Sequence, residues 1–247
     1  MAWASVGTLG TATSTSAGAT LSLTAAADAE VGNVVLLIIA KDNAASADGN
    51  TSEVTGVADD AGNTWAKLRE FCNAQGGAAA GATVSIWYSV VVNGITGGDI
   101  IEATFSGSIT SKAMIGWEFT VSASAVITVE GSADLANDAA DPGSMAISSL
   151  ASREYLFVRG IATESNDATL ITVTSSYTTF GRTVANTGTS ATSMGARGEF
   201  RILSGTGDTS DPTLFSADHA STFIALKEAA PPAAGQSNGL MLMGCGA

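Results

Sequence analysis

Apolar and polar residues alternate one by one in short runs along most of the chain, and this period of two is the strongest constraint on the fold. Ile101, Ala103 and Phe105, for example, alternate with Glu102 and Thr104. Such a spacing places successive side chains on opposite faces of a β-strand. No segment keeps the 3.6-residue spacing of an amphipathic helix beyond one or two turns. The pattern predicts an all-β chain of half-buried antiparallel strands.

Two runs are apolar at consecutive positions instead, Val34–Ala40 and the middle of residues 154–161. Consecutive apolar residues predict strands that are covered on both faces. The first run is about a third of the roughly 20 residues that a membrane-spanning helix needs. We therefore expect no membrane partner.

Turn chemistry separates the runs and sets the expected domain limits. Residues 59–63 read Asp-Asp-Ala-Gly-Asn, which is typical of a hairpin turn. We predict one jelly-roll-like β-sandwich over residues 1–228, with two lobes that meet near residues 134–142 as the alternative. Residues 229–247 begin with alanine and proline and end in an apolar tip, which predicts an extended C-terminal tail.

Acidic residues dominate the charge: 23 Asp and Glu face 10 Lys and Arg, a formal net charge of −13. Phosphate backbones and anionic lipids attract surfaces rich in Lys and Arg. We therefore exclude nucleic acid as a main partner. A protein partner of this chain should present basic residues or bound cations.

Small residues such as alanine, serine, threonine and glycine are typical of proteins that work outside a cell. The start of the chain, however, has no basic residue before Lys41 and no uninterrupted apolar run before Val34. We expect no secretory signal peptide, and release by lysis as part of a particle. Cys72 and Cys245 are expected to be reduced thiols.

The sequence offers little for catalysis. The single histidine, His219, lies between Asp218 and Ser221, but closeness in sequence does not make a catalytic triad. Motifs for nucleotide binding, zinc proteases and serine hydrolases are absent. Glycoside hydrolases need two carboxylates, and the candidates considered are Glu102, Glu118, Glu130 and Glu154. Solvated strand faces explain them more simply, so we predict that the chain is not an enzyme and has no cofactor.

Calcium is the most plausible ion, because three loops carry Asp and Asn oxygens. They are residues 42–50, 59–63 and 208–211. None has the spacing of an EF-hand loop. Asp and Asn cap turns far more often without a metal, and we predict no metal site.

Trp87 is the most suggestive side chain, because it shares a strand face with Ser85 and Ser89. Three interpretations stay open: the strand is covered on both faces, or the ring forms a partner contact, or the ring stacks on a sugar. Farther along, Arg197 and Glu199 begin an alternating run that includes Arg201, which predicts a solvent-exposed ladder of opposite charges.

Several segments together resemble structural proteins of tailed bacteriophages with a β-sandwich domain. They are residues 31–36, 54–65, 84–88 and 117–120, which read Val-Gly-Asn-Val-Val-Leu, Val-Thr-Gly-Val-Ala-Asp-Asp-Ala-Gly-Asn-Thr-Trp, Val-Ser-Ile-Trp-Tyr and Trp-Glu-Phe-Thr. The resemblance spans about residues 30–228. It implies a β-sandwich fold and a role in a virion, and it carries no catalytic residue.

The expected function is a non-enzymatic component of a bacteriophage virion, with a head decoration or cement protein as first choice. The alternative is a glycan- or receptor-binding module of a fibre or tail. Expected partners are further copies of the chain, with a trimer as one option, and other virion proteins such as the major capsid protein. The candidate contact residues are Trp87 and the apolar tip formed by Leu240, Met241, Leu242 and Met243.

Overall fold

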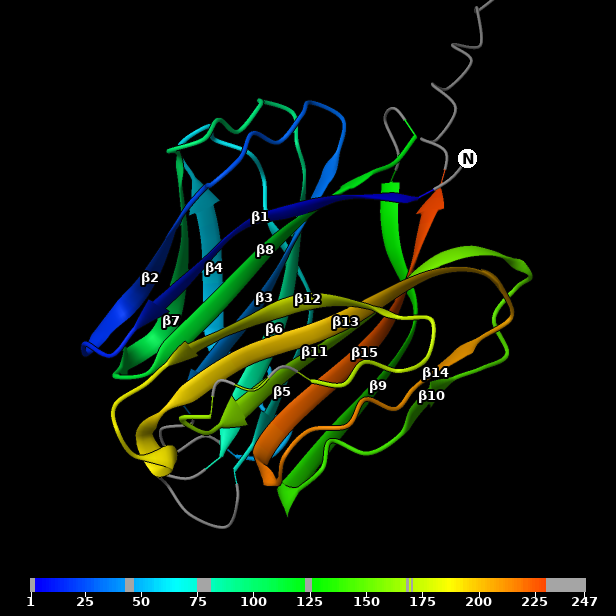
Figure 1. Cartoon of the computed structure of the whole chain (residues 1–247). Helices are drawn as coiled ribbons and strands as arrows, with labels where there is room; N and C mark the ends of the chain where they lie inside the picture. The colour runs from blue at the N-terminus through cyan, green and yellow to red at the C-terminus, as the bar shows by residue number, and fades with distance from the viewer. Residues whose placement is uncertain are drawn as a thin grey trace, which may run out of the picture.

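The computed structural model describes residues 3–42, 47–74, 81–122, 126–167, 169 and 171–229 (Figure 1). Apart from one short 3-10 helix, η1 (Ser190–Thr192), all regular structure in these residues is strand, so the all-β prediction is confirmed. No helix in the described residues is long and apolar enough to cross a membrane. The strands are β1 (Ala4–Ser14), β2 (Gly18–Thr24), β3 (Val34–Asp42), β4 (Val54–Asp59), β5 (Ala66–Asn73), β6 (Ala82–Val90), β7 (Ile100–Ile109), β8 (Lys112–Thr120), β9 (Val126–Ala140), β10 (Met145–Ile147), β11 (Arg153–Glu164), β12 (Thr178–Ala185), β13 (Met194–Gly205), β14 (Asp208–Ser210) and β15 (Ala217–Ala229).

The N-terminal half of the chain forms a sandwich of two antiparallel sheets. Sheet A has the strand order β1-β8-β3-β6-β5, and sheet B has the order β2-β7-β4. The core between them contains Val35, Leu37 and Ile39 of β3 together with Leu21 and Leu23 of β2. Because alternate residues of a strand share a face, the other residues of β3 face away from sheet B.

The C-terminal half forms a second sandwich with its own core. Sheet C has the strand order β12-β13-β11-β15-β9, and the small sheet D pairs β10 with β14. Met145 and Ile147 of β10 pack on Tyr155, Phe157 and Phe223 of sheet C. Sheet D therefore covers part of the outer face of sheet C.

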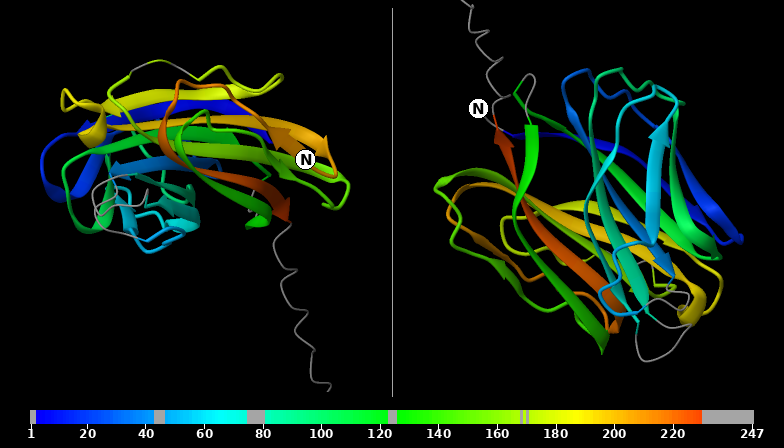
Figure 2. Two further views of the ribbon diagram at one scale, coloured as in Figure 1. Left: turned by 90° about the horizontal axis from the view of Figure 1, so that it is seen from below. Right: turned by 180° about the vertical axis from the view of Figure 1, so that it is seen from behind.

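Sheets A and C pack face to face, and this contact joins the two sandwiches (Figures 1 and 2). The shared core includes Leu36 and Ile38 of β3, Leu156 and Val158 of β11, and Ile224 of β15. The layers follow the order B, A, C and D. The sandwich prediction is confirmed, and β3 and β11 are buried on both faces as predicted, because each contributes to two cores.

The two sandwiches repeat one strand order. The order of sheet A becomes that of sheet C when β1–β3 are matched to β9–β11 and β5–β8 to β12–β15. The contacts between the sheets follow the same match: β3 contacts β13 as β11 contacts β6, and β8 contacts β12 as β15 contacts β5. The two halves are therefore related by an internal pseudo-two-fold axis.

Two expectations about topology need correction or stay open. Sheets A and B follow the jelly-roll strand order except at β5, which pairs with β6 instead of β4, so the jelly-roll topology is not confirmed. The second is the junction near residues 134–142, which belongs to the alternative of two lobes. It begins inside β9, which pairs with β15 over its whole length, and the chain passes between the sandwiches after Thr120, where β8 ends.

Glycines on one sheet make room for isoleucines on the other at the centre of the interface. Gly160 and Gly198 are cross-strand neighbours on β11 and β13, and Ile38 and Ile86 are the corresponding neighbours on β3 and β6. A Cβ atom built on Gly198 would lie 2.4 Å from Cδ1 of Ile38, and one on Gly160 would lie 3.3 Å from Cδ1 of Ile86. The symmetry-related positions therefore carry side chains of complementary size.

Each edge strand of the two large sheets is interrupted by a β-bulge. The register shifts within β1 near Gly7, within β5 near Arg69, within β12 near Gly181 and within β9 opposite His219 and Leu226. The ladders among the inner strands β3, β6 and β8, and among β11, β13 and β15, keep an unbroken register. Bulged edges oppose the addition of a strand from another molecule.

The predicted exposed ladder of charges on β13 is wrong. Arg197 and Glu199 are completely buried, because the segment after β11 folds over this face of sheet C. Arg197 donates hydrogen bonds to the carbonyl oxygens of Asp167 and Thr169, and Glu199 accepts one from the backbone of Thr174. Arg201 is partly exposed and pairs with Asp208 of β14 instead of with a charge on its own strand.

Candidate functional site

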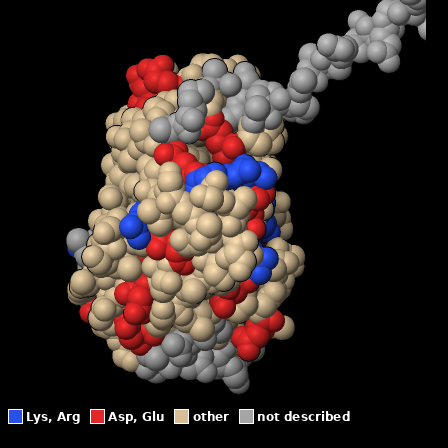
Figure 3. All heavy atoms as spheres, turned by 90° about the vertical axis from the view of Figure 1, so that its right-hand side faces the viewer, with Lys and Arg blue, Asp and Glu red and all other residues tan. Residues whose placement is uncertain are grey.

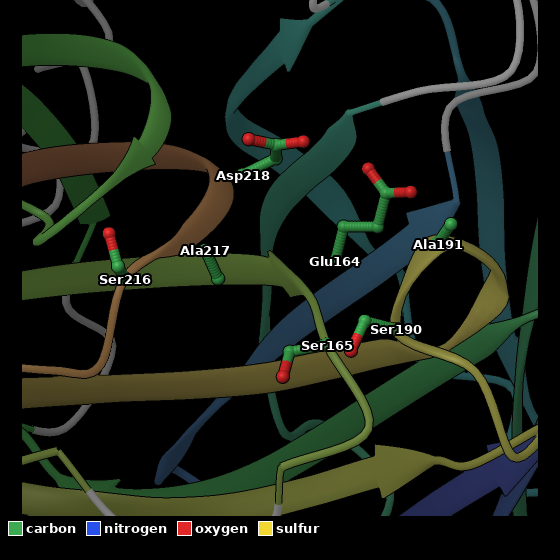
Figure 4. Close-up of a pocket in the computed structure, with 7 residues that line it drawn as sticks. All are labelled: Glu164, Ser165, Ser190, Ala191, Ser216, Ala217 and Asp218. Atoms are coloured by element: carbon green, nitrogen blue, oxygen red, sulfur yellow. The ribbon is translucent and has the colours of Figure 1, made fainter.

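The candidate site is a cavity of about 260 Å³ at one end of the interface between the sandwiches (Figure 4). Glu164 and Ser165 line it where β11 ends, and residues 216–218 line it where β15 begins. Ser190 and Ala191 of η1 close a third side. The lining therefore consists of two carboxylates, three serine hydroxyl groups and two alanine methyl groups.

The two carboxylates are held on neighbouring strands. Glu164 and Asp218 are directly opposed in the β11–β15 ladder, and their side chains extend to the same side of the ribbon in Figure 4. Oε2 of Glu164 accepts a hydrogen bond of 2.6 Å from the backbone N–H of Gly81, which precedes β6. This bond links the C-terminal sandwich to the N-terminal one.

The environment of Glu164 favours its protonated form. Burial raises the pKa of this carboxyl group to about 7, the hydrogen bond from Gly81 opposes that rise, and the negative charges of Asp42 and Asp218 add to it. Asp42 is the last residue of β3 and the symmetry counterpart of Glu164. The pseudo-two-fold axis thus brings like charges together at this end of the interface, and the site can take up a proton near neutral pH.

This shift predicts a pH-dependent stability. Because the folded state binds the Glu164 proton more tightly than the unfolded chain does, the stabilisation is fully present below the ordinary pKa of about 4.5 and is lost as the pH rises through about 7. The loss in free energy of unfolding should be at most about 3 kcal/mol. Urea melts of Glu164→Gln between these pH values should lack that slope. The surface variant Glu102→Gln should keep it, and an equally steep slope in Glu164→Gln would refute the assignment.

His219 does not line the cavity. Successive residues of a strand point to opposite faces, so His219 faces away from the side on which Asp218 lies. His219 is 1% exposed, and its Nδ1 lies 3.1 Å from the carbonyl oxygen of Ala217. Burial lowers the pKa of His219 below its ordinary value. Asp218 therefore cannot orient this imidazole toward a serine of the cavity.

The carboxylates first considered for hydrolysis are on four different strands. Glu102 accepts a hydrogen bond from Ser22, Glu118 accepts bonds from Glu30 and Asn33, Glu130 pairs with Lys227, and Glu154 accepts a bond from Trp3. Each is thus engaged within the fold. None of these four residues lies at the cavity described above.

Two of the three loops considered for calcium use their aspartate oxygen atoms for contacts within the fold. Asp59 accepts hydrogen bonds from the backbone of Asn63 and from Nε1 of Trp65, and Asp208 binds Tyr177 and Arg201. Among the residues that the structure describes, no group of three or more His, Cys, Asp or Glu is placed to hold a metal ion.

Trp87 lies in the core between sheets A and B. Its side chain is 6% exposed, its Nε1 donates a 2.8 Å hydrogen bond to Oγ of Ser85, and Nζ of Lys67 lies 5.5 Å from its ring. Of the three interpretations, burial of the strand on both faces fits. The predicted partner contact through Trp87 needs correction, because the small serines beside it make room for the ring inside. The other candidate contacts, Leu240 to Met243, lie outside the described residues.

Sequence reasoning missed Glu164 and the buried arginines. The available signal for Glu164 was a carboxylate directly after an apolar strand, a position where burial is costly. For Arg159 the signal was a cation in the middle of the same apolar run. The structure places Cys72 in the interior as a free thiol, where burial raises its pKa, whereas Cys245 lies outside the described residues.

Comparison of the chain with protein-family models, with curated proteins and with solved structures finds no match.

Proposed function

We propose that this chain is a non-enzymatic structural component of a bacteriophage virion, acting as a head decoration or cement protein. The proposal rests on the resemblance in sequence and on how the fold uses its charged groups. A cement protein must be a stiff block that meets a lattice through its outer faces. The stacked sandwiches and their bulged edges suit such a block, since contact through strand addition is discouraged.

The observation that carries the proposal is that most Lys and Arg side chains are buried or form ion pairs within the fold. Of the ten Lys and Arg residues, four are almost fully buried, one of which, Lys41, also pairs with Glu53, and four others form ion pairs. The buried four are Lys41, Lys112, Arg159 and Arg197, and the paired four are Lys67, Arg69, Arg201 and Lys227. Arg153 and Arg182 are exposed and form no ion pair with other described residues.

The buried cations stabilise turns rather than a reaction centre. Nζ of Lys112, for example, donates to the carbonyl oxygens of Ser16, Gly18 and Ile109 at 2.8–3.1 Å. The charge of the chain is mostly acidic, and the face in Figure 3 shows Asp and Glu scattered among uncharged residues, with a few Lys and Arg areas beside them. Such a surface complements a basic lattice or one that carries bound cations.

The test is attachment to particles. Particles purified from lysates that contain the protein should carry it in many copies by quantitative mass spectrometry. Purified full-length protein should rebind to particles stripped of it, and rebinding should weaken at high salt or with a chelator. An unrelated protein of similar net charge is the control. Absence of the chain from the particles, or equal retention of the control, would overturn the proposal.

A further inference from the structure

A second cavity, of about 310 Å³, lies at the opposite end of the interface between the sandwiches. Trp3, Ser152, Arg153, Glu154 and Glu228 line it. Continuing the β11–β15 register beyond the pair Leu156 and Leu226 places Glu154 opposite Glu228. The face of sheet C that packs on sheet A therefore has an acidic pair at each end, and of the two cavities the second is the one lined also by a tryptophan and an arginine.

Two polar atoms of these lining residues are buried and unsatisfied. Nε1 of Trp3 and Oε2 of Glu228 have no hydrogen-bond partner among the described residues, and the Trp3 side chain is 97% buried. A buried polar group without a partner is costly. The other donor of Trp3, its backbone N–H, donates a 2.7 Å hydrogen bond to Oε1 of Glu154. One residue thus combines a satisfied and an orphaned donor at the cavity.

The chemistry of these groups selects the class of ligand. An indole N–H needs an acceptor, whereas a carboxylate oxygen needs a donor. A simple ammonium ion would serve Glu228 but not Trp3, and an anion would serve Trp3 and Arg153 but would be repelled by two glutamates. Neutral hydroxyl groups both donate and accept, so a ligand with several of them serves all of these groups.

The size of the cavity limits the ligand. Its volume is at the lower end of the roughly 300–1,000 Å³ of small-molecule pockets. The rings of Trp3 and Phe119 are nearly perpendicular, with centroids 6.3 Å apart, and the orphaned N–H of Trp3 is the group that we expect to serve the ligand. We propose that this cavity, here named the Trp3 pocket, binds a single polyhydroxylated ring, that is, one sugar residue, through Trp3, Arg153 and Glu228.

This inference does not depend on the proposed virion role, because a sugar site could belong to either a cement protein or a receptor-binding module. The probe is a panel of methyl glycosides of glucose, galactose, mannose and N-acetylglucosamine, tested on the full-length protein by saturation-transfer NMR and calorimetry. At least one should bind, and glycine should not. Longer glycans with the same terminal sugar would distinguish a free sugar from a glycan end.

Conservative variants test whether the sugar binds in the Trp3 pocket. Trp3→Phe removes the indole N–H and keeps a ring, and Glu228→Gln removes the charge and keeps the shape. Each should weaken binding at least tenfold. Trp117→Phe is the matched control, because its indole N–H already binds Oγ of Ser5 elsewhere, and it should bind as the wild type does.

The two variants protect the test against a folding defect. Melting curves report whether each variant is folded, and if Trp3→Phe unfolds, Glu228→Gln decides alone. No binding by any glycoside, binding of glycine instead, or binding unchanged in the folded variants would overturn the proposal. Loss of sugar binding would leave particle attachment untouched, so failure of one proposal is distinguishable from failure of the other.

Discussion

Gly198→Val should destabilise the protein strongly, by about 3–5 kcal/mol. The new Cβ atom would lie 2.4 Å from Cδ1 of Ile38 and 2.6 Å from the backbone oxygen of Arg159. Side chains can rotate away from a clash, but the Arg159 carbonyl belongs to a strand that is paired on both sides. Sheet A and sheet C would have to separate, or β13 would have to shift. Chemical denaturation of wild type and variant measures the difference.

Gly107→Val is the matched control, because a Cβ atom at Gly107 on β7 meets nothing within 4 Å. It should change the free energy of unfolding by no more than about 0.5 kcal/mol.

A second comparison separates the two contacts of Gly198. Ile38→Val removes only Cδ1, so it should recover a minor part of the loss in Gly198→Ala. Full recovery would show that the backbone contact is unimportant. Similar stability of Gly198→Val and Gly107→Val would contradict the packing argument.

The strands could be predicted because the pattern of apolar residues that identifies each strand lies within that strand. Alternation within β7 and consecutive apolar residues in β3 and β11 report how many faces of each strand are covered. They do not report what covers them. A strand buried on both faces fits one large sandwich or two stacked ones equally well, and for that reason the stack of four layers did not follow from the pattern.

The internal symmetry was hidden for a physical reason. Corresponding positions in the interface complement each other in space, with Ile38 and Ile86 on one sheet facing Gly160 and Gly198 on the other. Complementary positions look different in sequence, whereas repeats are recognised by similarity. A chain with isoleucine at all four positions would show a clearer repeat, but its two sheets could not approach as closely.

The cavity residues escaped prediction because they come from distant segments. Glu164 meets Gly81, which is 83 residues earlier in the chain, and its carboxyl also responds to Asp42 and Asp218. Only the packing of sheet A on sheet C creates this neighbourhood. Trp87 is the opposite case, a residue that the sequence selected as a partner contact but that is buried. Its serine neighbours suggested a polar face, but Ser85 accepts a hydrogen bond from the buried indole.

Arg159→Leu should cost about 3–5 kcal/mol, because it removes a buried charge that satisfies many acceptors. Arg159 is completely buried on the side of sheet C that faces sheet D. Its guanidinium group donates to the carbonyl oxygens of Pro142, Gly143 and Ser210 at 2.8–3.0 Å, and its Nε donates to Oγ of Ser221 at 2.9 Å. Burial lowers its pKa to about 10, with the charge of Glu199 opposing that change, so the group stays charged at neutral pH.

The loss should be concentrated where those bonds are made. Without Arg159, the carbonyl oxygens of Pro142, Gly143 and Ser210 lose its donors, and the cross-strand neighbour Glu199 loses the positive charge opposite it. Hydrogen exchange should therefore rise first in residues 141–147 and 208–210, ahead of the β3 and β6 ladder. Arg182→Leu, at an exposed arginine of β12, should leave stability within about 0.5 kcal/mol of the wild type. Equal losses in the two variants, or exchange that rises evenly over both sandwiches, would show that Arg159 does not hold sheet D on sheet C.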